Sequence, residues 1–555
     1  MSSAQSPTPT ASNPLGDYIA TQYALSDSAQ TAFSAHLAAL LEQREQGHTL
    51  LHHSQDLHAN LAQYPSLTIS EEQAKAGEVA PIVLGERCSW LYRLWASEHQ
   101  VAQWLYHRLT HHSQPLNQEE IKPYLNTLNP QQKQAVLKAL TQPLTLINGG
   151  PGTGKTYTVA RIVQAYLNQH PQARLQLSAP TGKAANRMTQ TLTQNLPQTL
   201  TEQLPPAQTL HRLLGIRTHK SPRYHAQNPL DLDLLIIDEA SMLSLELTQQ
   251  LLNALAPKTT LILLGDAHQL AAVEAGAILH DLSQTPQLNP FIATLTQSTR
   301  FDKHSLIGQL ADATLNNQPQ ILLNLLAQHN SHHRPKTHNI SQIQSLYQQL
   351  FHPYQPYLNA LNQTPTAPNN DQIQPLFAQF DHYRILCAGH AGVLGTHTIN
   401  QQMRHYHQQS LKQPQSTNIP YYHGQPILIQ TNTPQLNLYN GDIGLCLINA
   451  HGEANLYFPN HSTPIAASYL NNKHLSDAYA LSIHKSQGSE FTHIAICLDT
   501  AQQRLISREL LYTAITRAKE SLSLYSDDSQ LIHALNTPTQ RQTGLAQQLQ
   551  TLIKR

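Results

Sequence analysis

The stretch Gly149-Gly150-Pro151-Gly152-Thr153-Gly154-Lys155-Thr156 decides how the fold of this chain is interpreted. It follows an apolar run at residues 144–147 and precedes residues 157–163, whose pattern predicts a helix. A strand, a glycine-rich loop and a helix with the spacing G-x-x-x-x-G-K-T make a P-loop. Its glycines let backbone N–H groups converge on phosphate oxygens, and the helix N-terminus adds partial positive charge. Because both flanking elements are present, a nucleoside triphosphate site at residues 149–156 is favoured over a glycine-rich turn that binds nothing.

Two side chains of this loop and one upstream glutamine are the first candidate ligands of a bound nucleotide. Lys155 would reach the β- and γ-phosphates of ATP, and the Thr156 hydroxyl would ligate Mg²⁺. Upstream, residues 128–136 start a helix that carries Gln132. A glutamine amide can donate one hydrogen bond and accept another, so Gln132 could read the edge of adenine. The alternative for Gln132 is an ordinary solvated helix face.

Three further apolar runs each end in a polar cluster. They are residues 175–179, 234–237 and 261–264. Short continuous apolar runs are typical of buried parallel strands, and ligands gather at the carboxyl ends of such strands. There, Asp238 suits Mg²⁺ coordination, and Glu239 suits positioning or deprotonating the attacking water. Gln269 suits contact with the γ-phosphate or with that water. A strand-end turn and a structural glutamine are the alternatives.

The composition sets outer limits on the class of protein. At 555 residues the chain is long enough for three or four domains of about 150 residues each. Its 34 basic and 34 acidic residues cancel, and its 33 histidines would add only roughly eight positive charges at pH 7. There is therefore no global electrostatic attraction for nucleic acid, although a locally basic groove is compatible with this balance.

Cysteine usage and hydropathy indicate a reducing, aqueous compartment. Four cysteines lie far apart with no C-x-x-C pair, which argues against a disulfide framework and against structural zinc. Residues 1–14 lack the basic and apolar regions of a signal peptide. Apolar runs stop at about six residues, far short of the roughly 20 that span a bilayer. The sequence predicts a soluble, cytoplasmic protein with no membrane partner.

Composition shifts divide the chain into segments. Apolar residues recur at helical spacing in residues 33–41 and 90–105, and the second stretch holds all three tryptophans, which indicates a helical core or a partner-docking surface. A second α/β unit follows two linker-like stretches, and it contains a β-rich insertion that could form a small barrel. The expected segments are a disordered tail (1–16), a helical N-terminal domain (17–125), a first α/β domain (126–328), a linker region (329–375) and a second α/β domain (376–555) with the insertion at about 419–471.

Two arginines outside the first P-loop unit are candidates for stabilising the transferred phosphoryl group. An arginine placed against the γ-phosphate from a neighbouring domain neutralises developing charge and couples hydrolysis to domain closure. Arg300 lies in Thr299-Arg300-Phe301, and Arg517 lies in the segment YTAITRAK at residues 512–519. A lone arginine on a helix is usually a surface residue, so only the surrounding motifs favour these two.

The ordered motifs together resemble those of superfamily 1 helicases. In chain order they are GGPGTGKT, APTGKAA, TLHRLLG, DEAS, GDAHQL, TRF, HKSQGSEF and YTAITRAK. Residues 273–277, residues 438–444 and the ending Gly544-Leu545 are similar to the alpha subunits of exodeoxyribonuclease V, the RecD subunits of RecBCD. The resemblance runs from about residue 128 to the C-terminus and is weaker before it. One departure is Ala267-His268, where relatives often carry a charged pair, but Gln269 remains.

This resemblance implies a fold, a substrate and a set of DNA contacts. The fold class would be α/β, with two RecA-like P-loop domains, a small β-barrel-like insertion and an N-terminal helical domain. ATP would bind between the two domains, and single-stranded DNA would run across both in a motor that moves 5′ to 3′. Such contacts follow the phosphate backbone and carry no sequence code. Local structural hydrogen bonding is the alternative for each residue. The DNA contacts implied by motif position are Thr181, Lys183, His211, His484, Lys485, Ser486 and Gln487.

Three hypotheses follow. The first is an ATP-driven 5′-to-3′ helicase acting on single-stranded and duplex-end DNA in recombinational repair, within a heterotrimer that includes RecB-like and RecC-like subunits. The second is a free-standing superfamily 1B helicase, whose usual helix-hairpin-helix repeats are not evident. The third is a scaffold that only binds ATP; it is disfavoured because Glu239, Gln269, Arg300 and Arg517 are all present. No nuclease site is evident, since Glu120-Ile121-Lys122 lacks a nearby Asp-bearing strand, so cleavage would belong to a partner.

Overall fold

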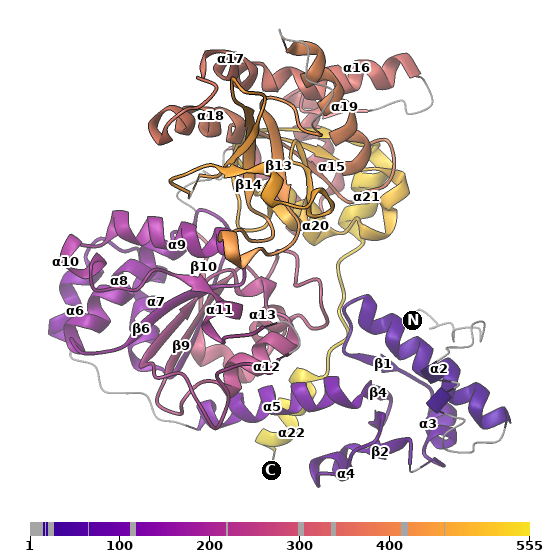
Figure 1. Cartoon of the computed structure of the whole chain (residues 1–555). Helices are drawn as coiled ribbons and strands as arrows, with labels where there is room; N and C mark the ends of the chain where they lie inside the picture. Colours follow the sequence, from indigo (N-terminus) through magenta and orange to yellow (C-terminus); the bar gives the residue numbers. More distant parts are fainter. Residues whose placement is uncertain are drawn as a thin grey trace.

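The structure is a computed structural model, and it describes residues 15–16, 18–19, 27–64, 66–110, 118–217, 220–297, 305–334, 340–411, 420–459 and 461–554. These residues form an N-terminal domain, two α/β domains and a C-terminal helix that returns to the N-terminal domain (Figure 1). Apart from Leu15 and Gly16, which are helical, the predicted disordered tail at residues 1–16 lies outside the described part of the chain. Within these ranges, every helix is too short or too polar to cross a membrane.

The N-terminal domain is mixed, and the prediction of a helical domain at residues 17–125 needs this correction. Its four short strands pair in the order β1-β4-β3-β2. Strands of three or four residues are too short to display a period-two pattern, and β3 is buried along its whole length, so its sequence resembles a stretch of buried helix. The elements are α2 (Asp27–Glu45), β1 (Leu50–His52), α3 (Gln55–Leu61), β2 (Thr68–Ser70), α4 (Glu71–Lys75), β3 (Ile82–Leu84), β4 (Cys88–Leu91) and α5 (Tyr92–Leu109).

The tryptophans belong to cores. Trp90 and Trp95 are buried in the N-terminal domain, and Trp104 packs against the core of the first α/β domain. Helix α5 therefore joins the two domains along its length. Helix α6 (Gln118–Leu125) packs against a helix of the first α/β domain, so that domain takes in residues that the predicted boundary at 126 left out.

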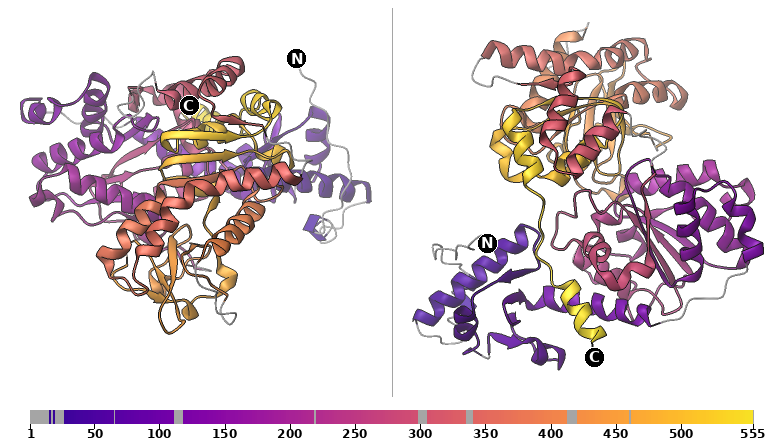
Figure 2. Two further views of the ribbon diagram at one scale, coloured as in Figure 1. Left: turned by 90° about the horizontal axis from the view of Figure 1, so that it is seen from above. Right: turned by 180° about the vertical axis from the view of Figure 1, so that it is seen from behind.

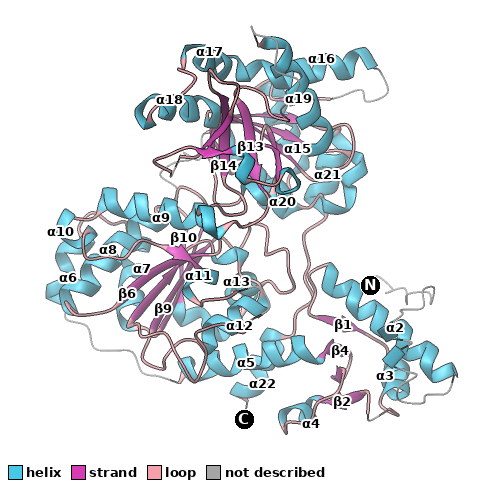
Figure 3. Cartoon of the chain, in the orientation of Figure 1, coloured by secondary structure: helices cyan, strands magenta, loops and turns pink. Residues whose placement is uncertain are grey.

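The first α/β domain is a parallel sheet covered by helices on both faces (Figure 3). Its strand order is β10-β5-β9-β8-β6-β7, and every described pair in it is parallel. Parallel strands end at one edge, so the loops after β5, β6, β8 and β9 gather there, as the sequence predicts. The elements are α7 (Pro130–Thr141), β5 (Leu144–Gly149), α8 (Lys155–Gln169), β6 (Leu175–Ala179), α9 (Gly182–Asn195), β7 (Gln208–Thr209), α11 (Leu210–Leu213), β8 (Leu234–Ile237), α12 (Leu245–Asn253), β9 (Thr260–Gly265), α13 (Ile278–Gln284) and β10 (Ile292–Leu295).

The second α/β domain has its own parallel sheet, in the order β11-β20-β19-β12-β18. Two parallel sheets flanked by helices agree with the predicted α/β class with two RecA-like domains. The elements are α14 (Leu306–Leu315), α15 (Pro319–Gln328), β11 (His332–His333), α16 (Ile340–Phe351), α17 (Gln355–Gln363), α18 (Asn370–Asp381), β12 (Tyr383–Cys387), α19 (Thr396–Ser410), β18 (Ala480–Ser482), β19 (Phe491–Cys497), α20 (Arg508–Ile515), β20 (Ala518–Tyr525) and α21 (Asp528–Asn536).

The predicted linker at residues 329–375 is wrong, because this region is folded into the second domain. Strand β11 pairs with β20, and helices α16 and α17 contribute to the main core. Tyr354 and Tyr357 are fully buried, and the Tyr354 hydroxyl donates to the carbonyl of Tyr479 at 2.8 Å. The region is rich in Gln, His and Pro and has few apolar residues. Its helices are stabilised only when those apolar residues pack against the rest of the domain.

The β-rich insertion projects from the second domain as a five-stranded antiparallel sheet, in the order β16-β15-β14-β13-β17. Gly441, in the Asn440-Gly441 turn signal, adopts φ of 96°, which suits glycine. Strands β16 and β17 are the two edges, so the described pairing is that of an open sheet rather than a barrel. The strands are β13 (Gln425–Ile429), β14 (Ile443–Ile448), β15 (Ala454–Tyr457), β16 (Ile465–Ala466) and β17 (Leu475–Asp477).

The C-terminal segment connects distant parts of the molecule. After α21 the chain runs away from the second domain and ends in α22 (Leu545–Ile553), which lies along α5 (Figure 2). Residues 537–544, here called the strap, cross the first domain on the way. Arg541 in the strap donates to the carbonyls of Ala272, Glu274 and Gly276. The strap therefore links the second domain to the first domain and to the N-terminal domain.

Candidate nucleotide site and nucleic-acid groove

The P-loop has the backbone that the sequence predicts. Gly152 and Gly154 adopt φ of 76° and 79°, a left-handed conformation that glycine takes without strain. The loop joins buried β5 to α8, and the helix begins at Lys155. The Lys155 ammonium donates to the carbonyl oxygens of Gly149 at 2.5 Å and Gly150 at 3.1 Å. The lysine thus lies across its own loop, at the N-terminus of a helix that favours anions.

Gln132 supports this loop from α7. Its amide nitrogen donates to the Thr153 carbonyl at 3.3 Å, and its amide oxygen accepts from the Asn129 backbone at 3.2 Å in a capping box. The side chain is buried, and it does not line the cavity described next. The predicted contact of Gln132 with adenine stays a prediction, because in this structure both polar atoms of the amide hold the P-loop.

A cavity of about 290 Å³ lies between the two α/β domains. Its first-domain walls come from the P-loop, the end of β8 and the loop after β9, and its second-domain wall comes from the segment before β19 and from Arg517. The structure therefore brings together six predicted side chains from distant parts of the sequence. They are Lys155, Thr156, Asp238, Glu239, Gln269 and Arg517.

Glu239 is the strained residue of this cavity. It follows β8 with φ of 54°, one of four non-glycine residues with positive φ among the described residues. Such strain persists where the surroundings fix it, and it is common at active sites. Burial raises the pKa of its carboxyl, as does the neighbouring Asp238, whereas Arg517, Lys155 and Arg187 oppose the rise. Glu239 is therefore held as a stronger base than an ordinary carboxylate.

The donors for Mg²⁺ are present in the same cavity. The Thr156 hydroxyl and the Asp238 carboxylate both line it and offer the hard oxygen ligands that Mg²⁺ prefers. No group of three or more His, Cys, Asp or Glu residues forms a metal site in the described chain.

A chain of hydrogen bonds crosses from the second domain to the first at Gln269. The Arg517 guanidinium donates to the Gln269 amide oxygen at 2.9 Å, and the Gln269 amide nitrogen donates to Asp266 at 3.3 Å. Asp266 also accepts from the Tyr512 hydroxyl at 3.0 Å. Arg517 and Gln269 are both buried, so the contact is well ordered. Arg517 therefore reaches the opposite domain, and its predicted contact with a γ-phosphate stays a prediction.

Four residues of this site are not predicted from the sequence. Asp266 and Tyr512 lie inside motifs that the sequence displays, but their pairing across domains is not local. Tyr512 also lies against the P-loop, since a methyl group added at Gly150 would meet its hydroxyl at 3.0 Å. Arg187 and Glu490 line the cavity as well. Arg187 carries no motif of its own, and no sequence signal identifies it. The predicted Arg300 lies outside the described residues.

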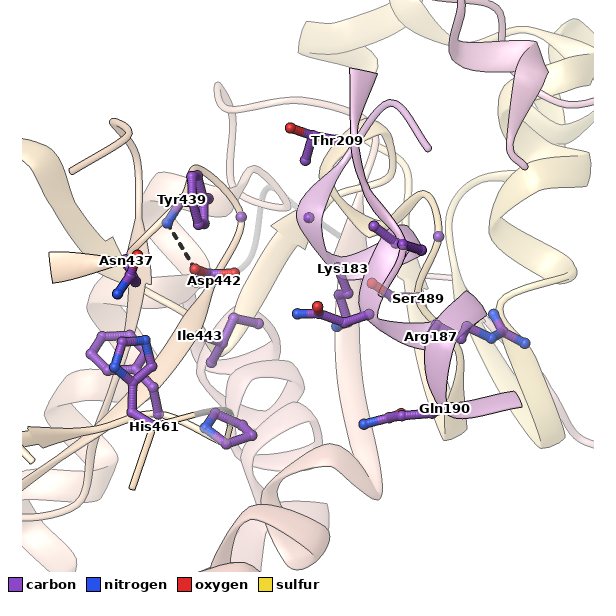
Figure 4. A pocket seen from close by; sticks show the side chains of 18 of the residues that line it. Lys183, Arg187, Gln190, Thr209, Asn437, Tyr439, Asp442, Ile443, His461 and Ser489 are labelled. Carbon is purple, nitrogen blue, oxygen red and sulfur yellow. Dashed lines mark hydrogen bonds between the residues drawn. The ribbon is translucent and has the colours of Figure 1, made fainter. Parts of the chain in front are cut away.

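Two larger grooves open beside the nucleotide cavity. The first, of about 990 Å³, lies between α9, the β insertion and the segment before β19. Figure 4 shows Lys183, Arg187 and Gln190 on one wall facing Tyr439, Asp442 and His461 on the other. The second, of about 1700 Å³, runs past Thr181 and His211 and is lined by Arg212, Arg217, Lys220 and Arg223. Tyr439, Asn437 and Thr209 line both grooves, so the two are continuous.

The predicted DNA contacts divide between these grooves and the protein interior. Thr181, Lys183 and His211 line the grooves, and the Lys183 ammonium lies 5.5 Å from the centre of the Phe491 ring. Burial lowers the pKa of Lys183. Their contact with DNA is consistent with this placement and stays a prediction.

The four predicted contacts at residues 484–487 lie differently. Ser486 is buried and donates to the Ile483 carbonyl at 2.7 Å, and buried Gln487 donates across the domains to the Leu270 carbonyl at 2.9 Å. His484 and Lys485 are half-buried, and burial lowers the pKa of each. In this arrangement Ser486 and Gln487 hold the two domains and their loops together rather than face a groove.

Family models match segments of both α/β domains. Residues 132–275 match the AAA domain, and residues 477–525 match the UvrD-like helicase C-terminal domain. The chain is 31% identical to the RecBCD enzyme subunit RecD of Haemophilus influenzae, over 86% of this chain and 83% of that protein. It is 36% identical to the RecBCD enzyme subunit RecD of Mycolicibacterium smegmatis, over 76% and 74% of the two chains. A solved structure of two coordinating Pif1 helicases on forked DNA matches with TM-score 0.40 and 16% identity, over 73% of this chain and 94% of that one.

Proposed function

This chain belongs to the RecD family of RecBCD enzyme subunits, and we propose that it is an ATP-dependent DNA helicase whose hydrolysis site is the cavity between its two α/β domains. One observation carries the location of the site. Arg517 of the second domain is bonded to Gln269 of the first, beside Lys155 and Glu239. A site assembled from two domains is the arrangement that converts hydrolysis into domain movement.

The first-domain residues bind the nucleotide. Backbone N–H groups of the non-proline residues among 149–154 and the Lys155 ammonium would hold the β- and γ-phosphates, with the amino terminus of α8 directed at them. Thr156 and Asp238 would hold Mg²⁺, which would neutralise negative charge on the phosphates. Gln132 and Thr153 keep the loop in shape, since Gln132 bonds the Thr153 carbonyl and Thr153 bonds the Gly150 carbonyl.

The remaining residues act on the attacking water and on the leaving charge. Glu239 accepts the proton of that water, for which a raised pKa is favourable. Gln269, fixed by Asp266 and Arg517, orients the water or contacts the γ-phosphate. Arg517 stabilises the negative charge that spreads over the transferred phosphoryl group. Arg517 belongs to the second domain and contacts Gln269 of the first, so turnover depends on the position of the second domain.

The DNA path runs through the two grooves. Their walls combine the first domain with the β insertion and second domain, so a single strand in them would contact both moving parts. Arginines and lysines there would neutralise phosphates without reading sequence. The resemblance to superfamily 1B helicases supports translocation 5′ to 3′.

In the cell we propose a cytoplasmic motor subunit. Its relatives in Haemophilus influenzae and Mycolicibacterium smegmatis are named as RecBCD enzyme subunits, which supports assembly with RecB-like and RecC-like chains. In that assembly the chain would act on duplex DNA ends in recombinational repair, and cleavage would be the work of a partner. A free-standing helicase or a scaffold that only binds ATP are the alternatives.

Unwinding of tailed duplexes tests this function. The purified chain is mixed with ATP, Mg²⁺ and a duplex that carries a 5′ or a 3′ single-stranded tail, and strand release is followed by fluorescence. We expect release with the 5′ tail only. The same assay with RecB-like and RecC-like subunits tests assembly, since rate and processivity should rise in the complex. Release that requires a 3′ tail would contradict the polarity, and no release alone or with partners would favour the scaffold.

A further inference from the structure

An ion pair joins the two α/β domains at the wall of the nucleotide cavity. The Arg187 guanidinium of α9 lies 2.6 Å from the Glu490 carboxylate, which belongs to the second domain. The Glu490 side chain is 10% exposed and the Arg187 side chain is 41% exposed, so the carboxylate is shielded from water while the arginine stays open to solvent. An ion pair in such surroundings is costly to break from one side, because a buried charge loses its partner. The pair is therefore built into the domain contact.

The same two residues also face the DNA groove. Arg187 and Glu490 line the 290 Å³ nucleotide cavity, and both line the 990 Å³ groove as well. Gly488, two residues before Glu490, lines both too. Figure 4 shows Arg187 on the groove wall, on the same helix as Lys183. This short wall is the part of the described protein that separates the two cavities.

The backbone around Glu490 is bonded to the arginine of the hydrolytic site. The Ser489 carbonyl accepts from the Arg517 guanidinium at 3.1 Å, and the Phe491 backbone N–H donates to the Arg517 carbonyl at 2.9 Å. On its other side, Phe491 lies under the Lys183 ammonium. A movement of residues 488–491 would therefore displace Arg517 relative to Gln269.

Arg187 has more than one acidic neighbour. Its charge is attracted by Glu490 and also by Glu239 and Asp238 on the first domain. A phosphate entering from the groove side would compete with Glu490 for the same guanidinium, since arginine binds phosphate and carboxylate by the same paired donors. A phosphate bound in the groove could therefore weaken the ion pair that restrains residues 488–491.

We propose that Arg187 and Glu490 are positioning residues that transmit occupancy of the groove to the hydrolytic cavity. The ion pair fixes residues 488–491, and through them Arg517, and a DNA phosphate that engages Arg187 releases this hold and lets Arg517 align for phosphoryl transfer. This inference rests on the proposed function. It assigns the coupling between DNA binding and ATP hydrolysis to one ion pair between the domains, and the motifs do not predict that pairing.

The test compares ATP turnover with and without oligo(dT) at saturating ATP for the wild-type chain and for Arg187→Ala, Glu490→Gln and the charge-swapped Arg187→Glu/Glu490→Arg. The measured quantity is the ratio of DNA-stimulated to DNA-free turnover. The single variants should raise DNA-free turnover and so lower this ratio at least about tenfold, because neither variant can hold residues 488–491. The swapped pair should restore low DNA-free turnover but not the stimulation, because a glutamate at position 187 cannot bind a DNA phosphate. Arg334→Ala is the matched control, since it breaks an exposed ion pair with Asp528, and neither residue lines either cavity.

The outcomes separate this inference from the function on which it rests. A wild-type chain without DNA-stimulated turnover would contradict the proposed function itself. Stimulation in the wild type that persists unchanged in Arg187→Ala and Glu490→Gln would overturn the coupling role. If Arg187→Ala lowers the melting temperature, Arg187→Gln keeps a long polar side chain and removes the charge. A stable Arg187→Gln chain with unchanged stimulation would likewise contradict the proposal.

Discussion

Glu239 and Gly154 of the hydrolytic cavity have a left-handed backbone that few residues other than glycine adopt. Replacing either residue therefore tests what that conformation contributes. Glu239 has φ of 54°, and Gly154 has φ of 79° at the first turn of α8. At Glu239 the left-handed backbone is strained, and it places the carboxylate at the wall of the cavity. At Gly154 the same conformation is free, because there is no Cβ.

Replacement of Glu239 by Gln should lower kcat by about 10²–10⁴-fold, the usual contribution of a positioned base. Binding of ATP should change little, since Lys155 and the P-loop remain. Burial and Asp238 raise the pKa of Glu239, so its basic form is lost, as pH falls, at a higher pH than for an ordinary carboxyl. The acid limb of the kcat/KM profile should reflect this raised value and should disappear in the Gln variant. An unchanged profile in that variant would assign the proton transfer elsewhere.

Replacement of Gly154 by Ala should weaken nucleotide binding. An alanine there must keep a left-handed backbone, and its Cβ would lie 2.5 Å from the Gln132 amide nitrogen. That amide cannot move without breaking its bonds to Thr153 and Asn129. A fluorescent ATP analogue measures the loss. Gly77→Ala is the control, because Gly77 has φ of 96° with open space around it, so only backbone strain of about 1–2 kcal/mol is expected.

At the scale of elements, the strap and α22 tie the C-terminus to the N-terminal domain through one buried carboxylate. Glu98 on α5 accepts hydrogen bonds from Thr49 at 2.6 Å, Trp90 at 3.0 Å and the Gly544 backbone at 2.8 Å. Burial nevertheless raises its pKa from 4.5 to about 7, against the effect of these donors. The charged form is therefore less stable in the folded protein than in the unfolded chain.

The docking of α22 should weaken as pH rises from about 4.5 to about 7. In that window the folded protein keeps a proton on Glu98 that the unfolded chain has lost, so stability falls with rising pH, by up to about 3 kcal/mol. Hydrogen exchange of the α22 amides between pH 5 and pH 8, corrected for intrinsic rates, measures the effect. Glu98→Gln should flatten this dependence. An equally steep dependence in that variant would assign it to another group, of which nearby Asp281 is the first candidate.

The elements also separate what the sequence could predict from what it could not. The P-loop, the acidic end of β8 and the Gln269 loop were predictable because each follows a buried apolar strand within a few residues. The sequence predicts a linker where helices α16 and α17 lie, because their apolar residues are sparse and their burial depends on distant strands. The sheet of the N-terminal domain was missed because its strands are only three or four residues long. The Arg187–Glu490 pair spans 303 positions, a separation at which a single sequence carries no signal.

At the scale of the whole molecule, the two α/β domains contact each other through bonds that surround the cavity. Thr513 accepts from the Leu270 backbone at 3.0 Å, and Gln487 donates to the Leu270 carbonyl at 2.9 Å. Together with the Arg517–Gln269 and Tyr512–Asp266 bonds, they connect the loop after β9 to α20 and to the segment before β19. The nucleotide cavity and the DNA grooves therefore share the same boundary between domains. Coupling of ATP turnover to DNA is the property that this architecture predicts.

ATP hydrolysis by the purified chain, measured with and without single-stranded DNA beside a Lys155→Gln control, tests that property most directly. We expect turnover that DNA strongly stimulates and that the control lacks, because Gln cannot supply the charge that Lys155 places at the phosphates. If the chain alone shows no stimulation, the measurement is repeated in the complex with RecB-like and RecC-like subunits, using the same Lys155→Gln control. ATP binding with no DNA-dependent turnover in either setting would contradict the motor and leave a nucleotide-binding scaffold.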